Sequence, residues 1–93
     1  MTERAIHKYT IAVADEQLVW MPRGAEVMSA HAQHGQICVW AAHTVPPKEL
    51  VGHTFYVHGT GHVFDHGNES LHFIGTVHLF EGSLVLHVFM RTD

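Results

Sequence analysis

The sequence predicts a single all-β domain: a small antiparallel β-sandwich or partly open barrel of about seven strands, with at most one short helical turn. Apolar residues recur with a period close to two in nearly every apolar run, as in strands buried on one face. Turn sequences such as His34-Gly35 and Glu81-Gly82 separate these runs at the spacing typical of sandwiches and barrels. A length of 93 residues fits one domain, residues 1–93, with one modest core.

The first half of the chain contains the first four expected strands. Residues 5–13 alternate between apolar and polar, and residues 14–17 form a turn. Residues 18–22 form a short strand that Pro22 must end or leave at a sheet edge, because proline has no backbone N–H. Residues 25–43 are the clearest hairpin, since Gly35 at its turn can take a positive φ.

The second half supplies the remaining strands. Residues 44–52 are expected to be a loop because they contain paired prolines, and residues 46–50 could form one helical turn. Residues 53–59 form a strand, and residues 70–80 and 83–91 form a closing hairpin around Glu81-Gly82. Large apolar residues in these alternating runs should supply much of the core: Tyr9, Ile11, Val39, Phe55, Val57, Phe73, Val77, Leu84, Leu86 and Val88.

Composition excludes several classes of protein. Apolar residues make up 46% of the chain and charged residues 15%, which argues against disorder. The net charge is −4 and the five cations are scattered, so the basic stripe of a nucleic-acid binder is missing and no nucleic-acid partner is expected. Cys38 is the only cysteine, which excludes an intramolecular disulfide and a cysteine-based zinc cage; its strand context predicts a buried, inert thiol.

The chain carries no sign of membrane insertion or export. Its first ten residues contain no apolar signal-peptide core. No apolar run approaches the roughly 20 residues that a membrane helix needs. We therefore expect a soluble protein of the cytoplasm.

The stretch VHGTGHVFDHGN, residues 57–68, contains three of the chain's 11 histidines and is the candidate metal site. His58, His62, Asp65 and His66 are residue types that bind zinc or other divalent metals, as in a small cupin-like metalloprotein with a distant histidine such as His72, His78 or His87. The four-residue spacing of His62 and His66 converges on a helix, however, and the neighbouring glycines disfavour a helix. No cofactor is therefore predicted, and a zinc or other divalent-metal site is the alternative.

The same stretch has two other interpretations. A phosphate loop is disfavoured, because no lysine or arginine lies between Lys48 and Arg91 and no helix follows. A structural role is favoured: a strand, a glycine bend around Thr60, and an exposed turn in which Asp65 bonds back to the backbone and Gly67 is left-handed.

No serine lies in a nucleophile elbow, so no catalytic residues are predicted. Trp20 and Trp40 are interpreted as core or interface anchors.

Several segments together resemble a family of small uncharacterised proteins of phages, prophages and their bacterial hosts. They are HKYTI, MPRGAEVMSAHAQHGQICVWA, FYVHGTGHVF and FIGTVHLFEGSLVLHVF, and the likeness covers nearly the whole chain, from about Ile6 to Phe89. The more specific pieces are P-x-G-A-E, V-W-A, G-T-G-H and H-V-F. The resemblance implies a compact phage-associated domain without an assigned activity, and it transfers no functional residue.

This context favours a non-enzymatic binding protein that contacts a host or phage protein and inhibits, for example, a host defence complex. The first alternative is the histidine-ligated metalloprotein. The second is a sponge that sequesters a small nucleotide-like signal in a dimer cleft. Elemental analysis of tag-free protein separates the first alternative from the binding hypothesis, and thermal-shift screening tests the second.

The closing hairpin is apolar on both faces, which predicts a homodimer. One face can pack on the core, and the other must meet a loop, a second sheet or another subunit, because monomers seldom expose large apolar patches. Twofold pairing is the commonest closed symmetry. The candidate interface residues are Ile74, Phe80, Val85, His87 and Phe89.

Overall fold

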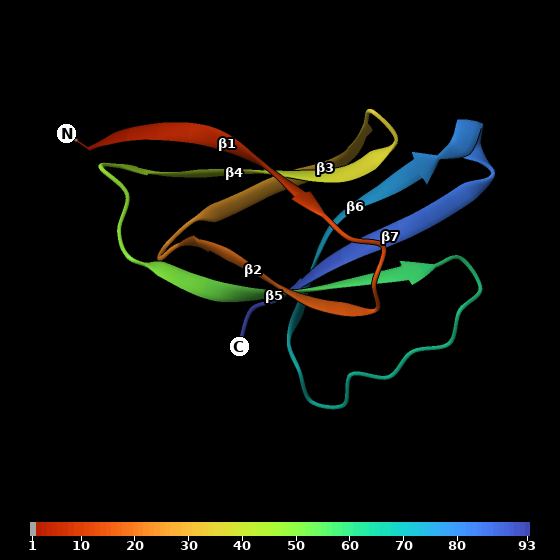
Figure 1. Ribbon diagram of the computed structural model, residues 1–93. Helices are drawn as coiled ribbons and strands as arrows, with labels where there is room; N and C mark the ends of the chain where they lie inside the picture. Colours follow the sequence, from red (N-terminus) through yellow and green to blue (C-terminus); the bar gives the residue numbers. More distant parts are fainter. Residues whose placement is uncertain (1) are drawn as a thin grey trace.

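The computed structural model, which describes residues 2–93, confirms the predicted all-β class. Seven strands form two antiparallel sheets that lie one above the other in Figure 1 and do not close into a barrel. One sheet has the order β1-β4-β3, with β1 (Glu3–Ile11), β4 (Gln36–Val45) and β3 (Glu26–Gln33). The other has the order β2-β5-β7-β6, with β2 (Glu16–Pro22), β5 (Leu50–Gly59), β7 (Leu84–Arg91) and β6 (Leu71–Leu79).

The short helical turn lies elsewhere than predicted. Strand pairing continues to Val45 and resumes at Leu50, so residues 46–49 are a short connection and the helical turn predicted for residues 46–50 does not form. The Arg23 N–H donates to the Glu49 carbonyl at 2.8 Å and fixes this connection. The helical turn is η1 (Phe80–Gly82), where all three residues take a positive φ to join β6 to β7. Within residues 2–93 no helix is long and apolar enough to cross a bilayer.

One hydrophobic core fills the space between the sheets and contains most of the predicted residues. Tyr9 and Leu84 are partly buried against it. The predicted residues buried in it are Ile11, Val39, Phe55, Val57, Val77, Leu86 and Val88. The core also contains residues that the sequence pattern did not predict. Met21 comes from β2, where no core residue was predicted, and Ile37 comes from β4, where only Val39 was. Cys38 is buried as a free thiol, as predicted.

Phe73 is the one predicted core residue that the structure places outside, with 51% of its surface exposed. Phe73 pairs with Phe89, but Gly75 pairs with Val88, so Ile74 is an extra residue in a β-bulge. The bulge moves every residue before it to the opposite face of the sheet. Ile74 therefore packs against the core, and the Phe73 ring meets the Phe89 ring edge-on at 5.5 Å on the outer side.

The two sheets contact each other mainly through β3 and β6. Gly75 of β6 lies so close to Ala30 of β3 that a Cβ atom added at Gly75 would be 3.0 Å from the Ala30 carbonyl oxygen. Ala30 is itself almost fully buried. A side chain at position 75 would therefore push the backbones of the two sheets apart.

This contact predicts that Gly75→Ala destabilises the protein by about 1–3 kcal/mol, because overpacking against a rigid backbone cannot relax cheaply. Gly52→Ala is the matched control: its Cβ would meet the flexible Leu18 side chain at 3.2 Å. That substitution should change the free energy of unfolding by less than about 1 kcal/mol. Urea denaturation of both variants measures the difference, and equal stabilities would contradict the prediction.

Candidate functional site

The outer face of the four-stranded sheet, which is turned away from the other sheet, carries the candidate site. Strand register places Glu16 beside Tyr56, Leu18 beside Thr54 and Trp20 beside Gly52 on this face. Residues 60–70, which we call the crossover loop, leave β5 and hang below the sheet in Figure 1 before returning to β6. The loop covers one half of the outer face and leaves the half nearest Trp20 open.

The crossover loop folds through local bonds, as its sequence indicated. Gly61 has a φ of 86° and allows the chain to reverse after β5. The Asp65 carboxylate accepts a hydrogen bond from the Gly67 N–H at 2.8 Å, and Gly67 is left-handed with a φ of 60°. The predicted strand, which includes Gly59, and the predicted exposed turn are therefore confirmed, and of the two glycines that flank Thr60 it is Gly61 that takes a positive φ.

Aromatic side chains attach the crossover loop to the sheet. The Phe64 ring stacks on the His58 imidazole, with ring centroids 4.1 Å apart and planes 8° from parallel. The same Phe64 ring lies 5.8 Å from that of Phe89. The His66 ring lies 4.0 Å from that of Tyr56. The loop thus covers apolar surface of β5 and β7 that would otherwise face water.

Glu69 is the polar anchor of the loop. Its carboxylate accepts a hydrogen bond from the Tyr56 hydroxyl at 2.8 Å, lies 3.0 Å from the Arg91 guanidinium, and lies 3.3 Å from Nδ1 of His66. Burial raises the pKa of Tyr56 to about 12, and the bond to Glu69 adds to this increase. Tyr56 is therefore a neutral donor throughout the physiological range.

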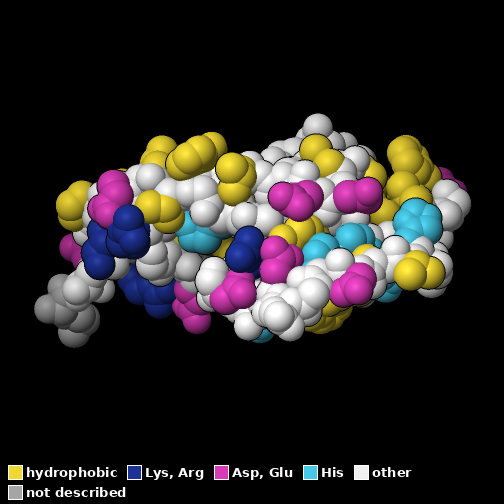
Figure 2. Space-filling model, turned by 90° about the horizontal axis from the view of Figure 1, so that it is seen from below, with side chains coloured by type: hydrophobic (Ala, Val, Ile, Leu, Met, Phe, Trp, Pro, Cys, Tyr) yellow, Lys and Arg dark blue, Asp and Glu magenta, His cyan; other side chains and the backbone are white. Residues whose placement is uncertain are grey.

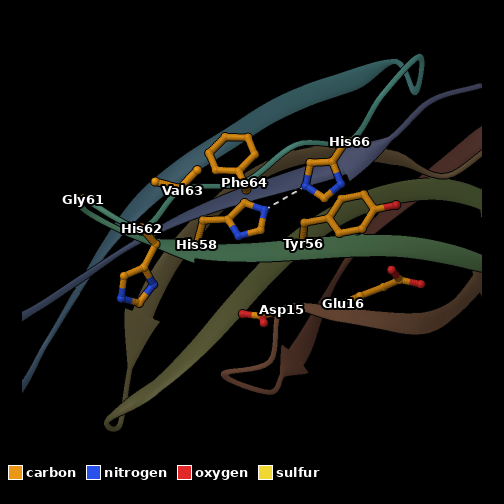
Figure 3. Close-up of a pocket in the computed structure, with 9 residues that line it drawn as sticks. All are labelled: Asp15, Glu16, Tyr56, His58, Gly61, His62, Val63, Phe64 and His66. Atoms are coloured by element: carbon orange, nitrogen blue, oxygen red, sulfur yellow. Dashed lines mark hydrogen bonds between the residues drawn. The ribbon is translucent and has the colours of Figure 1, made fainter.

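His58 and His66 meet inside the site. Their Nε2 atoms are 2.8 Å apart, so one ring donates a hydrogen bond and the other accepts it (Figure 3). His58 is 7% exposed, and burial, together with the nearby His66, lowers its pKa. A pocket of about 510 Å³ opens beside the pair, and Asp15 and Glu16 line it from the start of β2.

The four residues that the sequence suggested as metal ligands do not all come together in the structure. His58 and His66 come together, whereas His62 turns away from them in Figure 3 and packs against Gly59. Asp65 is occupied by its bond to the Gly67 N–H. In the described part of the chain, no three His, Cys, Asp or Glu side chains converge to hold a metal ion. Sequence reasoning did not identify Glu69 or Tyr56, and no sequence signal links them.

The open half of the outer face is apolar. Leu18 and Trp20 are each 59% exposed, and Leu50 is 61% exposed. Leu18 and Trp20 both lie over Gly52, whose missing side chain leaves room for them. Trp20 is therefore not a core residue. Figure 2, a view from below, shows apolar side chains gathered along one rim and acidic and histidine side chains across the middle.

The five candidate interface residues do not form one exposed patch. Ile74 packs against the core, and the Phe89 ring lies among those of Phe64, Phe73 and His58. His87 is within hydrogen-bonding distance of the Thr60 and Thr76 hydroxyls, at 2.7 and 3.0 Å. Val85 is half-buried. Phe80, at 70% exposure, is the member of the set that is left open to solvent.

Comparison with known proteins gives one positive result. No curated protein and no solved structure matches the chain. A family profile described as a domain of unknown function, DUF7352, matches residues 2–93. The chain therefore belongs to the DUF7352 family.

Proposed function

We propose that this chain is a small phage- or prophage-type binding protein that acts by contacting another protein and not by catalysis. The observation that carries the proposal is the open apolar half of the outer face, formed by Leu18, Trp20 and Leu50. The phage setting rests on the sequence resemblance described above. In that setting the protein acts in the cytoplasm of the host cell.

Trp20 is the residue on which binding should depend most. Tryptophan is enriched among the residues that dominate interface energies, because a large rigid ring buries much area at a small entropic cost. Its position over Gly52, beside Leu18, gives it a fixed apolar surround. A partner that covers this half of the sheet would remove three large apolar side chains from water.

Charge indicates the kind of surface that fits. Glu16 lies two residues before Leu18 on the same face of β2, Asp15 precedes it, and the chain as a whole carries a net charge of −4. The partner surface should therefore be apolar at its centre and carry lysine or arginine at the side that meets these carboxylates. A host protein, such as a component of a defence complex, is the proposed occupant.

A sponge for a nucleotide-like signal fits less well. The pocket of about 510 Å³ is large enough for a small molecule. Among the described residues that line it, however, are two carboxylates and neither lysine nor arginine. Asp15 and Glu16 would repel a phosphate group, so this pocket favours a cation or a neutral group over a nucleotide.

We also propose that the protein forms a homodimer through the turn between β6 and β7. Phe80 is 70% exposed there, and Val85, which pairs with His78 on the same hairpin, is half-buried. An exposed aromatic residue at a turn gives two copies a small self-complementary contact, and twofold pairing is the commonest closed symmetry. This contact is separate from the apolar half around Trp20.

The binding proposal predicts that Trp20→Ser abolishes capture of the partner. Wild type, Trp20→Ser and Met28→Ser, each with an N-terminal biotin tag, serve as baits in host-cell lysate. Met28 is the matched control because it is apolar, 52% exposed and on the other sheet. A protein captured by wild type and Met28→Ser should be lost with Trp20→Ser, and its purified form should bind that variant about 30-fold more weakly. Equal capture by all three baits would refute the proposal.

The homodimer proposal predicts a dimer mass for the wild type at tens of micromolar and a monomer mass for Phe80→Asn. Asparagine suits position 80 because it tolerates the positive φ of 50° there. Light scattering coupled to size exclusion measures both masses, and circular dichroism checks that the variant is folded. A wild-type monomer, or an unchanged dimer in the variant, would remove this proposal.

A further inference from the structure

We propose that His58 and His66 bind one divalent transition-metal cation of the zinc class through their Nε2 atoms, with the remaining coordination positions facing the pocket. The motivating observation is the 2.8 Å separation of two imidazole nitrogens that point at each other from β5 and from the crossover loop. Figure 3 shows both rings turned towards the same point. The two ligands are different residues from the three apolar side chains of the protein-binding surface, Leu18, Trp20 and Leu50.

The distance between the rings is close to that of a metal site. Two zinc–nitrogen bonds of about 2.05 Å at a tetrahedral angle hold their nitrogens about 3.3 Å apart. The rings would therefore need to separate by about 0.5 Å to admit the ion, and the ring that carries its proton on Nε2 would carry it on Nδ1 instead. His66 lies in the crossover loop and not in a paired strand, so a shift of this size breaks no strand pairing.

Glu69 prepares His66 as a ligand. Its carboxylate lies 3.3 Å from Nδ1 of His66, and this contact favours a proton on Nδ1 and a lone pair on Nε2. Glu69 is itself held by the Tyr56 hydroxyl and by Arg91. A carboxylate that orients a histidine in this way is the usual outer partner of a metal-bound imidazole.

The surroundings fix both rings and favour a cation. Phe64 stacks on His58 and Tyr56 packs on His66, so neither ring needs to be ordered when an ion binds. Asp15 and Glu16 place two negative charges on the wall of the same pocket. With two histidines as ligands, the other positions remain for water or for a donor atom of a bound molecule.

The test is zinc titration of tag-free protein by calorimetry, with histidine variants that separate this site from the other histidines. His58→Phe keeps a ring to stack on Phe64, and His66→Gln keeps a polar side chain in the loop. His72→Gln is the matched control, because His72 is exposed on β6. Wild type and His72→Gln should bind one ion with equal affinity, and His58→Phe and His66→Gln should lose that binding.

Glu69→Gln tests the positioning role of the carboxylate. Its affinity should fall about 10–100-fold, the usual effect of removing an outer carboxylate. Its bound Co²⁺ should keep the wild-type visible spectrum, because the ligands themselves are unchanged. A spectrum altered by Glu69→Gln would show that Glu69 is not a positioning residue.

Nuclear magnetic resonance of the wild type tests the site even if a histidine variant fails to fold. Zinc should shift the ring nitrogen signals of His58 and His66 and leave those of His72 unchanged. No stoichiometric binding, or binding that spreads over many histidines, would overturn the proposal. Wild-type affinity in both His58→Phe and His66→Gln would overturn it equally.

Discussion

The close approach of Gly75 to Ala30 is the constraint on which the two-sheet architecture depends. Neither sheet can cover its own inner face, so the core exists only where the sheets are held together. Contact between β3 and β6 holds them, and at its closest point a Cβ atom at position 75 would lie 3.0 Å from the Ala30 carbonyl oxygen. The bulge at Ile74 contributes to this contact between the sheets, because Gly75 faces Ala30 and Ile74 packs against the core.

Because the inner faces of both sheets are buried in the core, we place the proposed binding sites on the outer face of the four-stranded sheet. That face is divided by the crossover loop. Aromatic stacking of Phe64 on His58 and the bonds of Glu69 close one half over a pair of imidazoles. The other half keeps Leu18 and Trp20 exposed. A small domain thus presents a polar, titratable pocket and an apolar surface side by side, in a chain with few charges.

The period-two pattern predicted the fold class and the inward direction of residues such as Phe55, Val57 and Leu86, because alternation is local and burial follows it. It failed at Phe73, since a bulge changes the phase and leaves no mark in the alternation. It also could not predict that the crossover loop covers Phe89, a contact between segments distant in sequence. His58 and His66 were noticed as residue types, but their meeting depends on a reversal at Gly61 and on the turn from Asp65 to Gly67, which a strand or helix spacing does not describe.

The central claim about the site is that Glu69 orients His66 so that its Nε2 accepts a hydrogen bond from His58. The most direct test is the protonation of the four ring nitrogens, measured by nitrogen-detected nuclear magnetic resonance on metal-free protein near pH 8. The account predicts that His66 carries its proton on Nδ1 and that His58 carries its proton on Nε2. A neutral His66 ring with its single proton on Nε2 would contradict it, because that ring could then neither accept the bond from His58 nor face Glu69 with a donor.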